Sequence, residues 1–184
     1  MMIQRCDWAT HNELEQAYHD TEWGKPHKED AYLFQLLVLE SMQAGLSWAT
    51  ILKKRDTLTA AYDNWDYKKI AHYDDQKWQS LLEDKGVIRH LLKIKATTSN
   101  AEAFIKIQEE FGSFSDYVWG FVNHSPINNQ WKTINDIPSS THLSDTISKD
   151  FKRRGFKFLG STTVYAYLQA IGIVNDHLTS CSYK

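Results

Sequence analysis

Residues 81–95, "LLEDKGVIRHLLKIK", have the pattern of two helices with a glycine between them. Apolar residues recur at helical spacing on both sides of Gly86, and the glycine interrupts them. Val87 and Ile88, which follow directly, can anchor the turn on a hydrophobic core. The stretch therefore predicts two helices joined by a tight turn, with the second helix opening near Ile88. The unpaired amides at the start of that helix would form a ready site for an anion.

The same helical spacing runs along the rest of the sequence. Helices are expected at about 11–20, 30–44, 48–62, 66–73, 74–85, 89–111, 113–124, 141–153 and 161–174. Asn12, Ser47 and either Asp74 or Asp75 stand where N-caps are needed. The one long polar segment is 125–138, and strand alternation is limited to the short "FKF" segment. The prediction is an all-α fold.

Composition and charge exclude several classes of protein. The chain has 184 residues, enough for one domain, or one domain with a small elaboration, around a sizeable core. A formal net charge of -2 gives no global sign of nucleic-acid binding, so such a partner needs local basic patches. No membrane-spanning apolar run and no signal-peptide core are found, which predicts a cytoplasmic protein. A lone disulfide between the two cysteines is not expected there.

The two cysteines stand near opposite ends of the chain, each with a histidine at short range. Cys6 precedes His19 by thirteen residues, and His177 precedes Cys181 by four, the spacing of one helical face. Two cysteines and two histidines are a standard ligand set for structural zinc. We therefore expect a zinc clasp that ties the two ends together. The alternative is two buried cysteines and two ordinary histidines, because the chain has eight histidines in all.

A carboxylate interrupts the most apolar helix, "LFQLLVLESMQAGLSW" at 33–48. Glu40 has apolar residues three and four positions before it, so it must be hydrogen-bonded, paired or turned toward a pocket. The alternative is that Glu40 lies at the edge of the apolar stripe and reaches water. The aromatic residues nearest to it, or near the metal pair, are Trp8, Tyr18, Trp23 and Trp48. Together they suit a flat cationic ring, although core packing is the simpler interpretation of any single tryptophan.

Basic residues gather at three places in the sequence. They are Lys85, Arg89, His90 and Lys93 around the first glycine turn, Lys149, Lys152, Arg153, Arg154 and Lys157 around Gly155, and Lys53, Lys54 and Arg55. Each cluster alone is typical of a solvated face. Three clusters in a nearly neutral chain indicate a groove for nucleic acid. The pattern at 81–95 also resembles a helix-hairpin-helix, which holds a DNA backbone without reading its sequence.

Several blocks, in order along nearly the whole chain, resemble the DNA-3-methyladenine glycosylase I family of the helix-hairpin-helix glycosylase superfamily. The blocks are "RCDW" (5–8), "YHDTEWGKP" (18–26), "LESMQAGLSWATILKKR" (39–55), "GVIRHLLKIKATTSNA" (86–101), "FVNH" (121–124), "SKDFKRRGFKFLGSTTVYAYLQAIGIVNDH" (148–177) and Cys181. The segments "LESMQAGLSW" and "GFKFLG" are the most diagnostic of them.

The resemblance implies a single all-helical unit. A helix-hairpin-helix bundle at about 31–164 would be joined to a zinc-binding part made from about 1–30 with 165–184. The family's positions for a structural Zn2+ fall on Cys6, His19, His177 and Cys181. Nothing in the sequence requires more than a monomer.

The resemblance also implies a reaction on double-stranded DNA that contains alkylated bases. Enzymes of the family flip out N3-methyladenine and hydrolyse its N-glycosidic bond, which releases the base and leaves an abasic site. Glu40 matches the carboxylate that reads the base and is the catalytic candidate. Trp48 matches the ring that stacks on the base, Tyr18 a hydroxyl-bearing wall of the same pocket, and Trp8 and Trp23 neighbouring aromatic positions. The residues expected to contact DNA are Gly86, Val87, Ile88, Arg89, Lys93, Gly45 and Leu46. The aspartate that most of the superfamily uses has no counterpart here.

Two other classes of protein remain to be separated from this interpretation. A zinc-dependent hydrolase would need an open coordination position for water, which four protein ligands do not leave. A non-enzymatic DNA-binding module would bind DNA equally well after Glu40→Gln and would release no base.

Overall fold

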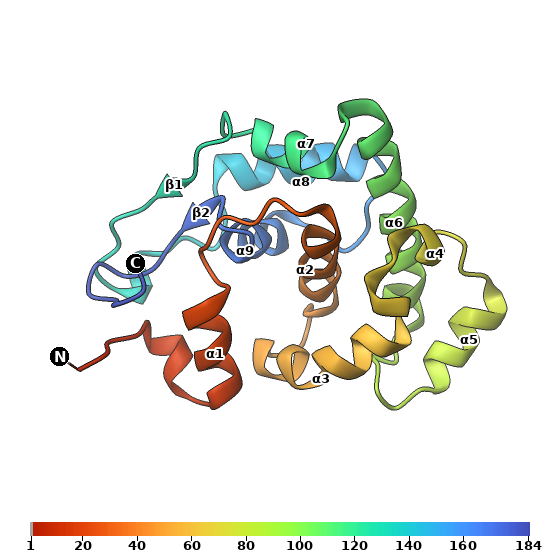
Figure 1. Ribbon diagram of the computed structural model, residues 1–184, viewed down its shortest axis with the longest axis horizontal. Coiled ribbons are helices and arrows are strands. Elements are labelled where there is room, and N and C mark those ends of the chain that lie inside the picture. Colours follow the sequence, from red (N-terminus) through yellow and green to blue (C-terminus); the bar gives the residue numbers. More distant parts are fainter. Residues whose placement is uncertain (1) are drawn as a thin grey trace.

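Helices dominate residues 2–184, the part of the chain that the computed structural model describes (Figure 1). The α-helices are α1 (Glu13–Thr21), α2 (Asp30–Met42), α3 (Trp48–Ala61), α4 (Tyr67–Ile70), α5 (Asp75–Glu83), α6 (Leu91–Phe111), α7 (Phe114–Gly120), α8 (His142–Arg153) and α9 (Ser161–Ala170). Short 3-10 turns lie at Asp7–Thr10, Asp63–Trp65 and Ile134–Asp136, and β1 (Ile127–Asn128) pairs in parallel with β2 (Val174–Asn175). The prediction of a mainly helical fold is confirmed. The strand pair was not expected, because two-residue strands carry no alternation to detect.

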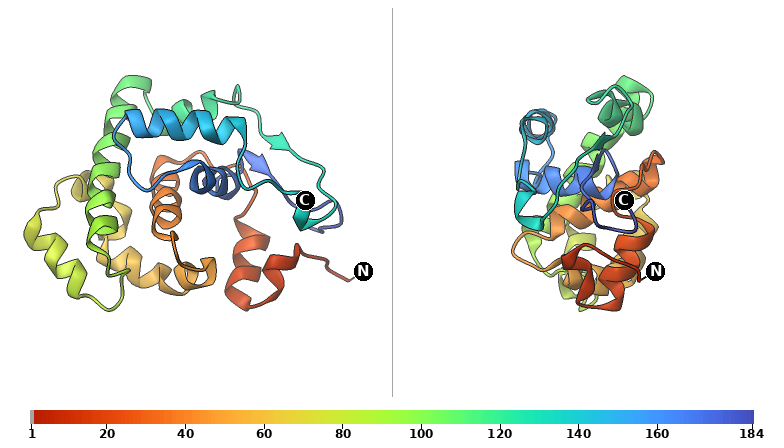
Figure 2. Two further views of the ribbon diagram at one scale, coloured as in Figure 1. Left: turned by 180° about the vertical axis from the view of Figure 1, so that it is seen from behind. Right: turned by 90° about the vertical axis from the view of Figure 1, so that its left-hand side faces the viewer.

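Helices α2 and α9 lie at the centre of the molecule, with the other helices around them (Figures 1 and 2). α2 contacts α3, α6, α7 and α9. Because neighbours cover it on several sides, its apolar residues lie all round the helix instead of along one stripe. Glu40 and Ser41 are the two polar residues that α2 buries. The fold thus places one carboxylate deep inside the protein.

The helix starts follow the capping residues in the sequence. The side chains of Asn12, Ser47 and Asp74 accept hydrogen bonds from the backbone N–H three residues later, as expected. α6 begins later than expected, at Leu91, and His90 caps it by accepting from the N–H of Lys93. The difference arises because the residues after Gly86 are used to complete the turn.

The two ends of the chain lie at the same end of the molecule (Figure 1). The N–H of Ser182 donates to the carbonyl of Gln4 at 2.8 Å, and the Ser182 hydroxyl accepts from the N–H of Gln4. α9 ends at Ala170 rather than at 174, because the chain turns at Gly172 with a φ of +76°. A Cβ on Gly172 would lie 2.1 Å from the backbone of Lys25, so this close approach requires glycine.

The predicted boundary between the two parts of the chain, 164/165, falls inside α9. α9 packs on both α2 and α8, so it belongs to the centre of the fold as well as leading to the C-terminal segment. The division into a bundle and a terminal part stays a prediction. Within 2–184, no helix combines the length and the apolarity that crossing a bilayer would require.

Candidate active site and metal centre

A cavity of about 320 Å3 lies where α1, α2, α3 and α9 meet, and it is called the Glu40 cavity below. Its lining consists of Trp8, Tyr18, Trp23, Glu40, Gln43, Trp48, Ile134, Ile137, Ala166 and Gln169. The five residues that the sequence assigned to a base pocket therefore line one cavity. They come from three separate stretches of the chain, which the fold brings together.

Glu40 is buried beside this cavity with only 5% of its surface exposed, so it does not lie at the solvent-facing edge of the apolar stripe. Among residues 2–184, no atom hydrogen-bonds to its Oε2. Burial raises the pKa of Glu40 to about 8 because the charged form is poorly solvated there. An unpartnered buried carboxyl group is costly, and a ligand that is cationic or donates hydrogen bonds would relieve that cost.

Two aromatic residues of the cavity also bury polar atoms without a hydrogen-bond partner in the described chain. These atoms are the Tyr18 hydroxyl and the Trp48 Nε1. Their ring centroids lie 5.2 Å apart, and burial raises the pKa of Tyr18, with the charge of Glu40 adding to the shift. Buried polar groups are normally paired, so three unpaired ones in one cavity mark a place for ligand atoms.

Sequence reasoning missed several residues of the cavity. Ile134 and Ile137 come from the polar loop at 125–138, where no periodicity points to a buried role. Gln43 lies three residues after Glu40, and this helical spacing was the signal that could have found it. A smaller cavity of about 220 Å3 adjoins the first, shares Glu40 and Gln43 with it, and is also bounded by Leu46.

The four residues predicted to bind a metal form one buried cluster. The ligand atoms of Cys6, His19, His177 and Cys181 all lie within 4.8 Å of one another, so the cluster could hold a metal ion. The Cys181 Sγ lies 3.5 Å from His19 Nε2 and 3.4 Å from His177 Nδ1. Tetrahedral zinc, with bonds of about 2.3 Å to sulfur and about 2.0 Å to nitrogen, needs sulfur–nitrogen separations of about 3.5 Å. The distances in the cluster therefore fit such an ion.

The predicted helical spacing of His177 and Cys181 is wrong, because 176–184 form turns after β2. Their convergence comes from the path of these turns. In both histidines, the ring nitrogen that does not face the cysteine sulfurs makes a hydrogen bond that orients the ring. His19 Nδ1 bonds to Asp20 Oδ1 at 2.8 Å, and His177 Nε2 bonds to the carbonyl of Trp23 at 3.0 Å. Such bonds are typical of metal-binding histidines, and they turn the other nitrogen of each ring toward the cysteine sulfurs of the cluster. Burial lowers the pKa of His177 to about 4, which keeps that ring in its neutral, ligating form.

The predicted glycine turn between α5 and α6 is anchored as the sequence suggested. Val87 is buried, the N–H of Gly86 donates to Asp84 Oδ1 at 2.7 Å, and the Thr57 hydroxyl donates to the carbonyl of Gly86 at 2.6 Å. Ile88 is half-buried and Arg89 is exposed. The turn thus presents Arg89 at the surface, and the Gly86 amide is already paired with the exposed Asp84 carboxylate.

Lys93 has a position that the sequence did not anticipate. It is only 6% exposed, and its Nζ donates to the carbonyls of Met42 at 2.8 Å and Ala44 at 2.6 Å. These carbonyls lie at and just beyond the C-terminal end of α2, where a cation is favourable. The ammonium group therefore has protein partners in the turn that carries Gly45, rather than an open path to a phosphate.

The second basic segment, between α8 and α9, lies beside the first. The ring of Phe158 stands 6.1 Å from that of His90, and Asn100 of α6 exchanges hydrogen bonds with the backbone of Lys157. Lys157 and Arg89 are both exposed. The tertiary structure thus combines two basic turns that the sequence places about seventy residues apart.

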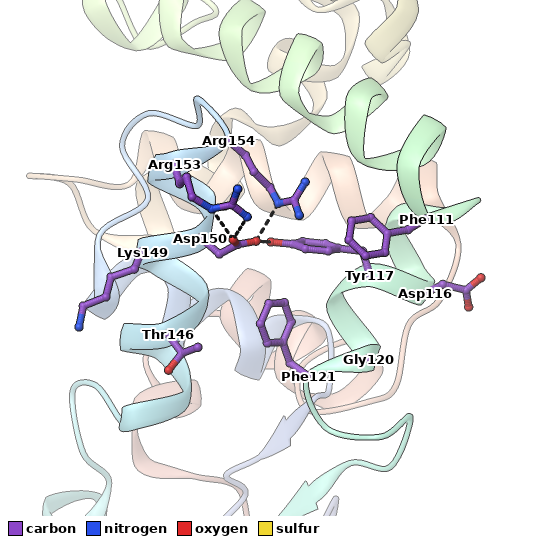
Figure 3. Close-up of a pocket in the computed structure, with 10 residues that line it drawn as sticks. All are labelled: Phe111, Asp116, Tyr117, Gly120, Phe121, Thr146, Lys149, Asp150, Arg153 and Arg154. Carbon is purple, nitrogen blue, oxygen red and sulfur yellow. Dashed lines mark hydrogen bonds and ion pairs between the residues drawn. The ribbon is translucent and has the colours of Figure 1, made fainter.

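A larger cavity of about 660 Å3 lies between α6, α7 and α8 and is called the Asp150 cavity (Figure 3). The Asp150 carboxylate accepts hydrogen bonds from the Tyr117 hydroxyl at 2.6 Å, from Arg154 Nε at 2.7 Å and from Arg153. Arg154 also pairs with Glu110. None of the unpartnered buried polar atoms in the described chain belongs to this cavity. Its size alone therefore does not mark it as a site for chemistry.

Comparison with known proteins identifies the class to which this fold and site belong. The model of the methyladenine glycosylase family matches residues 8–184, and the chain belongs to this family. It is 44% identical to DNA-3-methyladenine glycosylase 1 of Escherichia coli (strain K12), over 97% of this chain and 96% of the relative. It is 42% identical to DNA-3-methyladenine glycosylase of Haemophilus influenzae, over 100% of this chain and 99% of the relative. The resemblance seen in the sequence is confirmed.

Solved structures agree with this assignment. A crystal structure of 3-methyladenine DNA glycosylase I superposes with a TM-score of 0.94 at 45% identity, covering 97% of this chain and 98% of that chain. The structure that describes 3-methyladenine recognition by 3-methyladenine DNA glycosylase I of Staphylococcus aureus has a TM-score of 0.95 at 36% identity, covering 98% and 96%.

Proposed function

We propose that this protein is a DNA-repair hydrolase that removes 3-methyladenine from DNA by breaking the N-glycosidic bond. The observation that carries the proposal is the Glu40 cavity, in which one unpartnered carboxyl group lies among aromatic rings. Membership of the methyladenine glycosylase family supports the same activity. The products would be the free base and an abasic site.

The lesion itself supplies much of the driving force for the reaction. Methylation at N3 makes adenine cationic, so the bond between N9 and the sugar C1′ is already weakened. When that bond breaks, its electron pair neutralises the base, a water oxygen bonds to C1′, and a proton is released. The protein therefore needs to stabilise and orient the departing base more than it needs to supply a nucleophile.

The polar atoms of the Glu40 cavity complement such a base. Adenine carries an N6 amino donor and an N7 acceptor on its exposed edge. Glu40 in its ionised form can accept from the amino group, the Tyr18 hydroxyl can donate to a ring nitrogen, and the Trp48 indole can stack on the base. A cationic base also favours ionisation of Glu40, whereas neutral adenine offers no charge to offset its burial. We propose that this difference makes the cavity selective for 3-methyladenine over unmodified adenine.

The base must leave the duplex to reach this cavity. The turn between α2 and α3 carries Gly45, with a φ of +78° and open space around it, and Leu46, which is 37% exposed. Leu46 borders the smaller cavity beside Glu40. We infer that Gly45 and Leu46 fill the gap that the flipped base leaves in the stack.

The two adjacent basic turns are the candidates for holding the DNA backbone. Among described residues, the amides of Ile88 and Arg89 have no hydrogen-bond acceptor, and Arg89 and Lys157 add positive charge at the surface. Amides and cations of this kind bind phosphates without reading sequence. Lys93 supports the turn at Gly45 in this proposal and does not contact the phosphate directly.

The Cys6, His19, His177 and Cys181 cluster is proposed to hold a structural zinc ion. The hydrogen bonds to both histidines and the distances within the cluster support zinc there. When bound, the ion would contribute stability by tying the two ends of the chain. Its position behind Tyr18 and Trp23 would hold those residues against α2 and α3. Four protein ligands leave it no role in activating water.

One assay tests the function directly. The protein is incubated with methylated duplex DNA, and the bases released are separated and identified by mass spectrometry. We expect free 3-methyladenine, and DNA that becomes cleavable by alkali at the resulting abasic sites. Release of 7-methylguanine in its place, or tight binding without any released base, would contradict the proposal.

A further inference from the structure

Arg55 joins the three helices that supply the polar atoms of the Glu40 cavity. Its Nη1 and Nη2 donate to the two carboxylate oxygens of Glu22 at 2.8 and 2.9 Å, and Nη2 also donates to Oε1 of Gln35 at 3.2 Å. Glu22 is the C-cap residue directly after α1, Gln35 belongs to α2 and Arg55 to α3. One guanidinium group thus connects α1, α2 and α3.

Glu22 stands between two residues that line the cavity. It follows Tyr18 by four residues and directly precedes Trp23, and its N–H donates to the carbonyl of Tyr18 at 2.9 Å. The Tyr32 hydroxyl also donates to its carboxylate. Any shift of Glu22 would therefore move Tyr18 and Trp23 together.

Arg55 and Gln35 are likewise on the same helices as two other residues that line the cavity, Trp48 and Glu40. Arg55 lies seven residues after Trp48, two turns along the same face of α3. Gln35 lies five residues before Glu40 on α2. The contacts of Arg55 therefore set the spacing between the helix that carries Trp48 and the helix that carries Glu40.

The charge of Arg55 is compensated inside the protein. Its side chain is 19% exposed and that of Glu22 is 24% exposed, and the two form a bidentate pair, the strongest geometry available to arginine. This differs from the sequence interpretation, in which Arg55 belonged to a basic cluster facing nucleic acid. Burial alone raises the pKa of Glu40, so Arg55 does not act on that carboxyl group through its charge.

We propose that Arg55 is a positioning residue for base excision, which holds Tyr18 and Trp48 at their working distance from Glu40 by clamping Glu22 and Gln35. The inference rests on the proposed function and deepens it, because it names how the pocket is kept assembled. Arg55 touches neither the base nor the DNA in this account. Its effect should therefore appear in the rate of the chemical step and in binding of the free base, and not in the affinity for DNA.

The test compares Arg55→Met with Arg154→Met, a second partly buried arginine that pairs with two carboxylates away from the cavity. Both variants should lose similar stability. Arg55→Met should lower the single-turnover excision rate at saturating DNA by about 10- to 100-fold, the size of effect that small misplacements of catalytic groups produce. It should also weaken binding of 3-methyladenine, measured by tryptophan fluorescence, while DNA affinity is unchanged. Arg154→Met should leave excision and base binding unchanged. The Arg154 side chain is only 14% exposed and pairs with Asp150 and Glu110, so it is not among the residues proposed to hold the DNA, contrary to its place in the basic cluster of the sequence.

Milder variants guard against a chain that fails to fold. Arg55→Lys keeps the charge and one contact and should recover part of the rate, and Glu22→Gln should reduce the rate with a smaller loss of stability. Equal excision by Arg55→Met and Arg154→Met would overturn the clamp alone, as would a loss confined to DNA affinity. If the wild-type chain released no base, the proposed function would fall, and the clamp with it.

Discussion

The Glu40 cavity and the Asp150 cavity both contain a partly or fully buried carboxyl group beside aromatic rings, but the two groups differ in their partners. Asp150 accepts hydrogen bonds from Tyr117, Arg153 and Arg154, whereas Oε2 of Glu40 has no partner in the described chain. The Asp150 cavity is about twice as large. Hydrogen-bond partners, and not volume, therefore distinguish the two cavities. The fully hydrogen-bonded Asp150 network stabilises the fold, whereas the unpartnered polar atoms of the Glu40 cavity can still bind a ligand.

The pKa values of the two carboxyl groups express the same difference. Burial disfavours the charged form in both. At Asp150 the hydrogen bonds from Tyr117, Arg154 and Arg153 outweigh burial and lower the pKa to about 2. At Glu40 nothing opposes burial, and the pKa rises to about 8. A single comparison of hydrogen-bond partners thus separates a structural acid from a candidate functional one.

Removing a proposed zinc ligand should have the largest effect, and the effect should be confined to the region around the Glu40 cavity. Cys181→Ala, or a strong chelator, should lower the free energy of unfolding by about 3 kcal/mol or more, because the clasp closes a loop of nearly the whole chain. Hydrogen exchange should quicken in 2–24 and 171–184, beside the Glu40 cavity, while α6 and α8 around the Asp150 cavity keep their protection. The chelator should have no further effect on Cys181→Ala. Unchanged thermal unfolding in both experiments would show that there is no clasp.

Glu40→Gln should abolish most of the activity without weakening the fold. The substitution removes the negative charge offered to a cationic base, and one hydrogen bond to a charged group is worth about 1.5–3 kcal/mol, or about 10- to 150-fold in rate. Single-turnover excision of 3-methyladenine measures the loss. The melting temperature at pH 7 should be equal to or above that of the wild type, since a buried acid has been replaced by a neutral amide. A variant that excises at the wild-type rate would remove Glu40 from the mechanism.

Asp150→Asn should lower stability and leave excision unchanged, the opposite of what is expected for Glu40→Gln. It leaves Arg153, Arg154 and Tyr117 with a weaker acceptor, so stability should fall by about 1–3 kcal/mol. Excision should be unchanged, because the Asp150 cavity takes no part in the proposed reaction. Urea unfolding and the single-turnover assay measure the two quantities. A loss of excision greater than the loss of folded protein would mean that the larger cavity has a function too.

The smallest expected effect is a difference between Glu40 and Asp150 in how each contributes to stability as the pH changes. Glu40 holds its proton more tightly in the folded state, so its contribution to stability is present below its unfolded pKa of 4.5 and is lost as pH rises through about 8. The stability of Glu40→Gln relative to wild type should therefore increase across that range, by at most about 1.4 kcal/mol per pH unit. Asp150 has a lowered pKa, so Asp150→Asn should show a constant deficit there and approach wild type only below about pH 4. Parallel pH profiles for the two variants would contradict this assignment.

Much of the local structure could be predicted from the sequence because it depends on neighbouring residues. Asn12, Ser47 and Asp74 mark helix starts through hydrogen bonds to amides only three residues away. The start of α6 was misplaced because the turn at Gly86 uses several residues whose conformation depends on contacts with Thr57 of another helix. Helical spacing also failed for His177 and Cys181, which belong to the same Cys/His cluster without lying on one helix.

The site was predicted in part, and the missing part has a common cause. Glu40 stood out because a carboxylate on an apolar helix is costly, and its aromatic neighbours were identified through the resemblance to a family. Ile134 and Ile137 could not be found, because their loop has no periodicity and reaches the cavity only through the fold. Lys93 and Arg55 were both assigned to surface clusters, since a sequence does not show which cations have partners inside the protein.

From the amino-acid sequence alone came the helical class, the four residues of the Cys/His cluster, the unusual position of Glu40 and the family, because these depend on composition, spacing and motif order. The burial of Glu40, the polar atoms left without partners and the cations already paired with carboxylates became visible only in the folded chain. The physical reason is that hydrogen bonds and ion pairs act over a few ångströms in space, between residues that can stand far apart along the chain.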